Sequence, residues 1–75
     1  MKQDVKIYDR VGNLLKVNDE VFDGYDTNTL EIYNDEWCIS SDKSIWRIEE
    51  FVLSIYKDGI KLVDFIKEDK IYEIH

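Results

Sequence analysis

The sequence lacks most of the residues on which disulfide bonding, metal binding and membrane insertion depend. Its 75 residues include one cysteine, one histidine, three glycines and no proline. A single cysteine cannot form an internal disulfide, so the fold does not depend on an oxidising compartment. No apolar run approaches the roughly 20 residues that span a bilayer, and the first residues contain no apolar segment typical of a signal peptide. We therefore expect a cytoplasmic protein that does not contact membranes.

Basic residues are absent from a long central stretch. Between Val17 and Asp42 there are eight acidic residues and no lysine or arginine. The other 49 residues carry nine acids and ten bases, so the net charge of −7 comes from this stretch alone. Such a charge argues against direct binding to nucleic acid, because that binding is driven by lysine and arginine side chains that neutralise phosphates.

No group of residues indicates catalysis. His75 is the last residue, and it cannot complete a metal site without several partners. Cys38 has apolar and acidic neighbours, which raise the pKa of a thiol. The adjacent carboxylates Glu49–Glu50 and Glu68–Asp69 point to opposite faces if they lie in strands. The sequence therefore predicts a non-enzymatic protein without a cofactor or a bound metal.

Calcium is the competing use of the clustered carboxylates. Four side chains with a carboxylate or amide oxygen lie in the stretch from Asp23 to Glu31. An EF-hand loop requires Asp-x-[Asp/Asn]-x-[Asp/Asn]-Gly with a glutamate at its twelfth position, whereas Gly24 directly follows the first aspartate here. This mismatch argues against an EF-hand and leaves open only a weak site of another geometry.

Composition and patterning predict one small, mostly β domain over residues 1–75. Apolar residues make up 44% of the chain and aromatic residues 13%, which is typical of a folded protein. Short runs rich in strand-forming residues alternate with turn signals, a pattern of small antiparallel barrels and sandwiches. The expected strands are Val5–Tyr8, Leu14–Val17, Thr29–Tyr33, Trp37–Ser40, Glu50–Lys57 and Lys70–Ile74.

Several segments between these strands have a turn or an ambiguous pattern. Residues 18–28 have the composition of a loop, and Asp58-Gly59 is the strongest hairpin-turn dipeptide. The segment Ile45–Tyr56 fits either one face of a helix or a strand, and its β-branched and aromatic content favours a strand. Lys61–Ile66 fits a returning strand or a short helical turn. We expect most aromatic residues to form the core, namely Tyr33, Trp37, Trp46, Phe51 and Phe65.

The opening segment Val5–Val21 resembles small bacteriophage and mobile-element proteins with SH3-like barrels, including the YopX-like group. In these proteins a strand is followed by the motif Asp-x-x-Gly, a second strand and the motif Val-Gly-Asp-x-Val. Asp9 and Gly12 match the first motif. Asn18 stands where glycine is usual, and asparagine tolerates the same left-handed backbone. With the closing segments, the resemblance covers about two thirds of the chain. It implies an SH3-like barrel of about five strands and a phage setting, but no catalytic residue.

The acidic stretch supplies the hypothesis about function. Carboxylates on alternate residues of a strand lie about 6.6 Å apart, which is of the order of the phosphate spacing in nucleic acids. Small acidic phage proteins, including some anti-CRISPR proteins, are similar in size and charge. We expect an acidic face that mimics DNA and inhibits a basic, nucleic-acid-binding host protein such as a defence nuclease. The expected contact residues are Asp19, Glu20, Asp23, Tyr25, Asp26, Glu31, Asp35 and Glu36.

Two other interpretations stay open. The acids can simply form a solvated surface that keeps a small protein in solution. Alternatively, the chain can be a structural or assembly protein of a phage that forms oligomers through an exposed sheet edge. The sequence does not determine the oligomeric state. It also does not determine whether the acids share one face. Acids on one face would favour a binding surface, whereas acids on opposite sides would favour a solvated surface without a partner.

Overall fold

The computed structural model describes residues 1–69. In this part of the chain there are eight short strands and one 3-10 turn, η1. No helix within residues 1–69 has the length and apolar character needed to cross a membrane. The elements are β1 (Lys6–Tyr8), β2 (Glu20–Phe22), β3 (Thr27–Tyr33), β4 (Glu36–Ser40), β5 (Ile45–Arg47), η1 (Ile48–Glu50), β6 (Leu53–Tyr56), β7 (Gly59–Leu62) and β8 (Ile66–Lys67).

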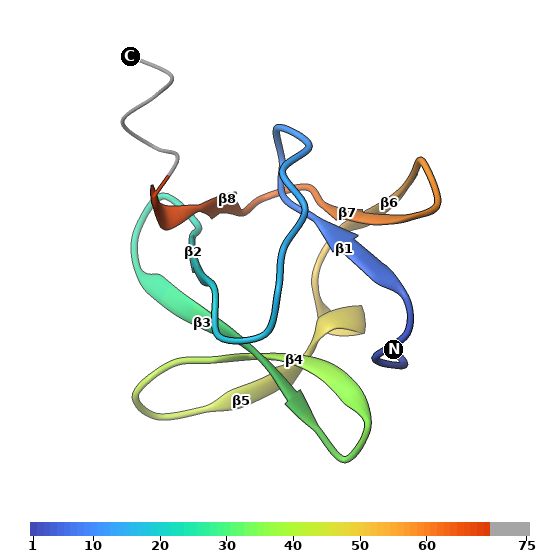
Figure 1. Ribbon diagram of the computed structural model, residues 1–75. Helices are drawn as coiled ribbons and strands as arrows, with labels where there is room; N and C mark the ends of the chain where they lie inside the picture. The colour runs from blue at the N-terminus through green and yellow to red at the C-terminus, as the bar shows by residue number, and fades with distance from the viewer. Residues whose placement is uncertain (70–75) are drawn as a thin grey trace.

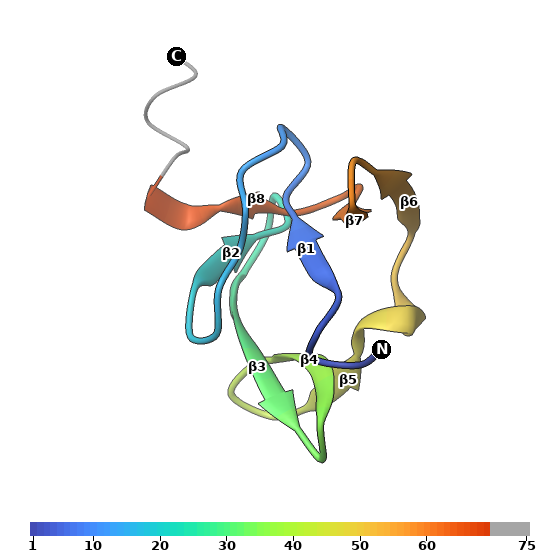
Figure 2. The same ribbon diagram turned by 45° about the vertical axis from the view of Figure 1, so that its right-hand side comes forward.

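The strands form two sheets that enclose one core (Figures 1 and 2). One sheet has the order β1-β7-β6 and the other β5-β4-β3-β2-β8. The expected mostly β class is confirmed, and every strand pair is antiparallel except β1–β7, which is parallel. The buried core is Ile7, Leu15, Val21, Leu30, Trp37, Ile39, Ile48, Leu62 and Phe65.

The β3–β4 hairpin agrees closely with its prediction from sequence. Tyr33 pairs with Glu36, so the connection has two residues, Asn34 and Asp35. Both have positive φ angles, 52° and 64°. This is a type I′ turn, whose twist matches that of the flanking strands and which asparagine and aspartate tolerate well.

The first predicted pair of strands forms only in part. β1 is present, but Leu14–Val17 is not a strand, and its pairing with β1 is limited to a bridge between Tyr8 and Leu14. The chain turns again directly after this bridge, because the Asp19 carboxylate accepts a hydrogen bond from the Lys16 backbone N–H. Asn18 has a φ of 75°, as expected for a residue that replaces glycine.

Within the expected loop 18–28, Glu20–Phe22 is the strand β2. It pairs with both β3 and β8, so tertiary pairing stabilises a segment too short to be recognised by its pattern. The ambiguous segment Ile45–Tyr56 is not a helix: it contains β5, η1 and β6.

The β6–β7 hairpin differs by one position from its prediction. Tyr56 pairs with Gly59, so the turn residues are Lys57 and Asp58, and Gly59 begins β7. The expected helical turn within Lys61–Ile66 is absent from the structure. That segment ends β7, turns through a hydrogen bond from the Phe65 amide to the Leu62 carbonyl, and enters β8.

The aromatic core is smaller than expected. Trp37 and Phe65 are buried, Trp46 and Phe51 are half-buried, and Tyr33 is 58% exposed because it ends β3 beside the hairpin turn. The predicted strand Lys70–Ile74 and His75 lie outside the described residues.

Candidate functional site

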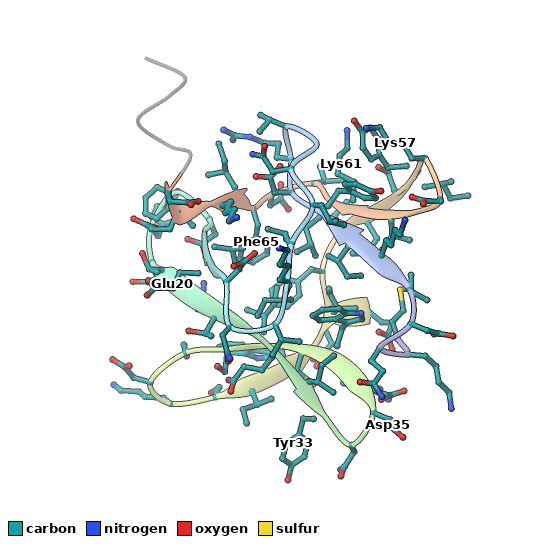
Figure 3. All side chains as sticks on the ribbon, viewed as in Figure 1. Glu20, Tyr33, Asp35, Lys57, Lys61 and Phe65 are labelled. Carbon is teal, nitrogen blue, oxygen red and sulfur yellow. The ribbon has the colours of Figure 1, made fainter. Side chains whose placement is uncertain are left out.

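The acids of the base-free stretch are spread over several separate places. β3 joins two of them, and its seven residues span roughly 20 Å. Asp23 and Asp26 lie at its start, whereas Asp35 and Glu36 lie beyond its end. Figure 3 shows Glu20 and Asp35 on different sides of the molecule. The question that the sequence left open is therefore answered: these acids do not share one face, because the β2–β3 and β3–β4 turns are at opposite ends of one strand.

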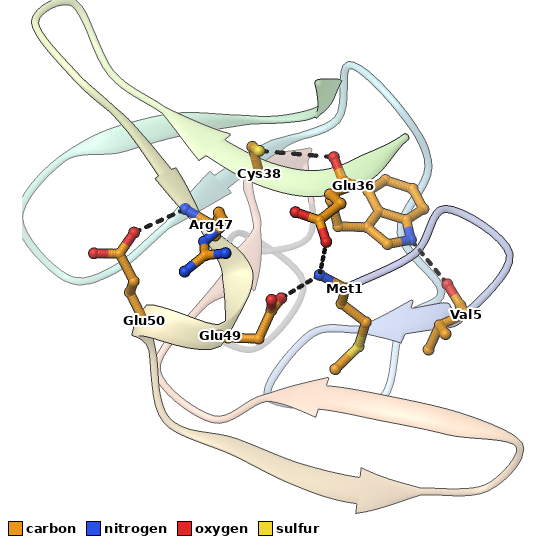
Figure 4. A network of polar contacts seen from close by, with 8 residues as sticks. Met1, Val5, Glu36, Cys38, Arg47, Glu49 and Glu50 are labelled. Carbon is orange, nitrogen blue, oxygen red and sulfur yellow. Dashed lines mark hydrogen bonds and ion pairs between the residues drawn. The ribbon is translucent and has the colours of Figure 1, made fainter. Parts of the chain in front are cut away.

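The acids near the β3–β4 turn are engaged in local contacts (Figure 4). The Met1 ammonium group donates to Glu49 and lies 3.7 Å from Glu36. This hydrogen bond lowers the pKa of Glu49. Asp35 accepts a hydrogen bond of 2.9 Å from the Gln3 side chain.

Glu31, Asp19 and Glu20 lie elsewhere. The Glu31 carboxylate accepts a hydrogen bond from Ser40 on the neighbouring strand β4. Asp19 lies 3.7 Å from the Lys67 ammonium group and borders a hollow shared with Glu20. The positive charge of Lys67 offsets the acids at this place.

Two further acids, Asp23 and Asp26, lie at the β2–β3 turn. The Asp23 carboxylate determines the geometry of this turn. The Asp23 carboxylate accepts the backbone N–H groups of Tyr25 and Asp26, both at 2.8 Å. Gly24 has a φ of 98°, which few other residues adopt without strain. Tyr25 is therefore held at the tip of the turn, where it is 90% exposed.

Beside this turn lies a cleft of about 150 Å³ with aromatic walls. Trp46 comes from β5, Phe51 follows η1, and Phe65 precedes β8. The rings pack edge to face, with centroids 6.3 Å apart for Trp46–Phe51 and 5.1 Å apart for Phe51–Phe65. This arrangement is favourable for aromatic pairs and fixes the shape of the cleft. Asp23 and Asp26 line the same cleft.

Two shallower hollows continue from the cleft on either side. One contains Asp26, Asp42 and Lys43, and the other contains Asp64, Tyr25 and Arg10 among its lining residues. Neither of the two bases forms an ion pair within residues 1–69. We call the surface formed by Asp23, Tyr25, Asp26, Asp42, Asp64 and the three aromatic rings the acidic–aromatic surface.

The strongest pKa shift occurs away from this surface. Hydrogen bonds from Lys6 and Tyr8, each 2.7 Å long, lower the pKa of Asp58 to about 2. The same bonds raise the pKa of Lys6 and of Tyr8. The Asp58 side chain is 56% exposed, so this group is an open ion pair.

Cys38 is also removed from the acidic–aromatic surface. The thiol is buried, and burial, followed by the Glu36 carboxylate, raises its pKa. The direction of this shift agrees with the prediction from its neighbours. No group of three or more His, Cys, Asp or Glu side chains within residues 1–69 is placed to hold a metal ion.

Comparison of the chain with protein-family models, with curated protein sequences and with solved structures finds no match in any of the three. The site is therefore defined by geometry alone. The sequence predicts Trp46, Phe51 and Phe65 in the core, and neither Asp42 nor Asp64 is among the expected contact residues. Their proximity to Asp23 arises from tertiary pairing between distant segments, for which the sequence contains no local signal.

Proposed function

We propose that this protein is a non-enzymatic protein-binding module that engages a basic surface of another protein. The observation that supports the proposal is the acidic–aromatic surface. Asp23 and Asp26 line its aromatic cleft, and the hollows beside the cleft contain Asp42 with Lys43 and Asp64 with Arg10 and the exposed Tyr25. Exposed tyrosine is a frequent interface anchor, and carboxylates accelerate encounter with a basic partner. A role in binding requires no catalytic residue in addition to these carboxylates and this tyrosine.

The distribution of the acids refines the kind of contact that we propose. The carboxylates group around a cleft and do not form a row along β3, so we favour a compact contact over mimicry of a nucleic-acid strand. A basic groove on a host nuclease is one partner of suitable chemistry, and occupation of such a groove would inhibit the nuclease. A phage origin would fit that activity.

The proposal is tested by neutralising three acids whose side chains form no hydrogen bond or ion pair within residues 1–69. The variant Asp26→Asn/Asp42→Asn/Asp64→Asn removes three negative charges at the acidic–aromatic surface. Tagged protein is used to capture partners from host lysate in low salt, and the captured partner is purified and measured by calorimetry. We expect a basic partner whose affinity falls with added salt, because exposed charges are screened beyond about 8–10 Å.

The matched control is Asp4→Asn/Glu20→Gln/Asp35→Asn, which changes the net charge by the same amount at distant positions. We expect the control to bind almost as tightly as the wild-type protein, and the first variant to lose most of its affinity. Equal affinities for both variants would show that only the net charge matters. Unchanged binding by the first variant would refute the proposal.

One observation favours a second function, assembly through a sheet edge. β6 is the outer strand of the three-stranded sheet, and Ile55 on it is 90% exposed. The preceding Val52 is 61% exposed. An exposed edge strand with apolar side chains is a template for pairing with another chain. This alternative places the contact on β6, away from the acidic–aromatic surface.

A further inference from the structure

We infer that the cleft between Trp46, Phe51 and Phe65 binds one cationic side chain, lysine or arginine, of the partner. The inference rests on the proposed function, since it identifies the contact that would anchor the basic surface. It assigns a distinct role to the cleft: the surrounding acids attract the partner, and the aromatic rings hold a single residue.

The size of the cleft favours a single side chain as its occupant. Pockets for drug-sized ligands usually measure about 300–1,000 Å³, whereas this cleft has about 150 Å³. The adjoining hollows are larger, about 330 and 440 Å³, but they are more open than the cleft, so the part between the aromatic rings alone encloses only a small group. A side chain that enters from a partner's surface needs only the volume of its own stem and head group.

The aromatic walls favour a cation. Lysine and arginine are attracted to the faces of aromatic rings, and tryptophan is the strongest such partner. Within residues 1–69, the cations that lie over aromatic rings are on the opposite sheet. Lys57 lies 5.2 Å from the Tyr56 ring centroid and Lys61 lies 5.0 Å from it. No lysine or arginine of residues 1–69 lies over the rings of Trp46, Phe51 or Phe65.

The polar residues of the cleft also fit a cation. Asp23 and Asp26 supply negative charge beside the rings, and Asn28 supplies a buried amide that is 7% exposed. The one side-chain hydrogen bond of Asn28 within residues 1–69 is weak, from Nδ2 to the Asp26 carbonyl at 3.5 Å. An N–H group of lysine or arginine can donate to the Asn28 carbonyl oxygen, which accepts no side-chain hydrogen bond within residues 1–69, while Nδ2 keeps its contact with Asp26. An apolar side chain would gain nothing from the negative charge of Asp23 and Asp26 or from the Asn28 carbonyl oxygen.

The test uses nuclear magnetic resonance of the full chain with small probes. The probes are the Nα-acetyl methylamides of lysine, arginine and norleucine; norleucine has a similar apolar stem and no charge. We expect saturable shifts of the Trp46 indole N–H and the Asn28 side-chain amide with lysine or arginine and none with norleucine. The indole of Trp37 is an internal control, because it is buried and donates to the Val5 carbonyl at 2.9 Å.

A second measurement needs no mutation. Nuclear Overhauser contacts between the last methylene group of the bound probe and the Trp46 and Phe65 rings would place the cation in the cleft. Equal shifts with norleucine would overturn the inference in favour of a simple apolar pocket. An absence of saturable shifts with both cationic probes would overturn it as well. The stronger of the two cationic probes identifies the preferred side chain.

The variant Trp46→Ala separates this inference from the proposed function. We expect it to abolish the shifts and to weaken binding to the purified partner at least tenfold, with unchanged dispersion of the amide spectrum as proof of folding. We expect Asp26→Asn/Asp42→Asn/Asp64→Asn to weaken probe binding roughly three- to tenfold, as is typical for several exposed charges. If Trp46→Ala binds the partner normally and the acid variant does not, the cleft inference fails and the proposed function stands.

Discussion

At position 59 the chain has space for a hydrogen atom and for nothing larger. A Cβ atom there would lie 2.1 Å from the backbone carbonyl oxygen of Lys6. Lys6 and Gly59 are partners in the parallel ladder between β1 and β7. The glycine is therefore required for the close approach of two strands. It is not the left-handed residue of the adjacent hairpin turn, since that residue is Lys57, with a φ of 50°.

We expect Gly59→Ala to destabilise the protein by about 3 kcal/mol, the upper part of the usual range for overpacking, because the clash is with backbone. The measurement is chemical denaturation followed by tryptophan fluorescence. Gly24→Ala is the control, since a Cβ atom at Gly24 would meet no other atom within 4 Å and only the φ of 98° is unfavourable. A smaller loss for Gly59→Ala than for Gly24→Ala would contradict this account.

Asp58 gives a prediction about pH at the same scale. Its pKa in the folded protein, about 2, lies below its usual value of 3.8, so the ionised form stabilises the fold. That contribution is fully present above the usual value and is lost as the pH falls through about 2. We expect the difference in Tm between the wild-type protein and Asp58→Asn to be largest near neutral pH and to shrink between about pH 4 and pH 2.

The control for this experiment is Asp4→Asn, which changes an exposed aspartate that makes no side-chain contact within residues 1–69. Its effect on Tm measures the removal of one surface negative charge without the loss of an ion pair. A carboxyl titration of Asp58 by carbon NMR measures its pKa directly. A value near the usual one would show that the bonds from Lys6 and Tyr8 are not maintained in solution.

At the scale of elements, Asp9 connects two strands that are distant in sequence. Its buried carboxylate accepts the amides of Val11 and Asn13, at 3.1 and 2.7 Å, and the side chain of Asn13. It also accepts the backbone N–H of Lys67 in β8 at 2.8 Å. The turn after β1 is therefore fastened to the strand that closes the larger sheet.

We expect Asp9→Ala to destabilise the protein by roughly 3–5 kcal/mol, because each buried donor left without a partner costs about 1–3 kcal/mol and water replaces some of the bonds. The measurement is urea denaturation, with hydrogen exchange of the Lys67 amide as the local readout. Asp4→Ala, on the surface, should change stability by less than about 0.5 kcal/mol. A loss for Asp9→Ala as small as that of the control would refute the role of this carboxylate.

For the whole molecule, charge is distributed unevenly over the two sheets. Lys57 and Lys61 lie together at the β6–β7 side of the molecule (Figure 3), where they cover the Tyr56 ring. Asp23 and Asp26 lie at the β2–β3 turn of the larger sheet. If the partner is basic, as we propose, we expect this distribution to direct it to the acidic–aromatic surface and away from the smaller sheet.

The assembly alternative makes a prediction at the same scale. If β6 pairs with another copy of the chain, light scattering should show a mass that rises with concentration and does not depend on salt. Ile55→Lys should then return the protein to a single chain, since a charge on an edge strand opposes pairing. A mass of one chain at all concentrations would remove this alternative and leave the acidic–aromatic surface as the contact.

Local features of the fold were predictable from the sequence because their causes are local. The Asn34–Asp35 turn, the left-handed Asn18 and the exposed Tyr25 follow from residue conformational preferences and polarity. Strand-forming composition predicted the mostly β class for the same reason. The net charge of the stretch from Val17 to Asp42 also follows from the sequence, by counting its acidic and basic residues.

Only the tertiary structure decided where these features meet. β1 pairs with β7 across some fifty residues, and β2 is a strand because β3 and β8 lie on either side of it. The length of β3 separates acids that are neighbours in the sequence, whereas the folding of β5, η1 and β8 brings three rings to Asp23. Sequence determined how much negative charge the protein carries; packing between distant segments determined which carboxylates lie beside the cleft.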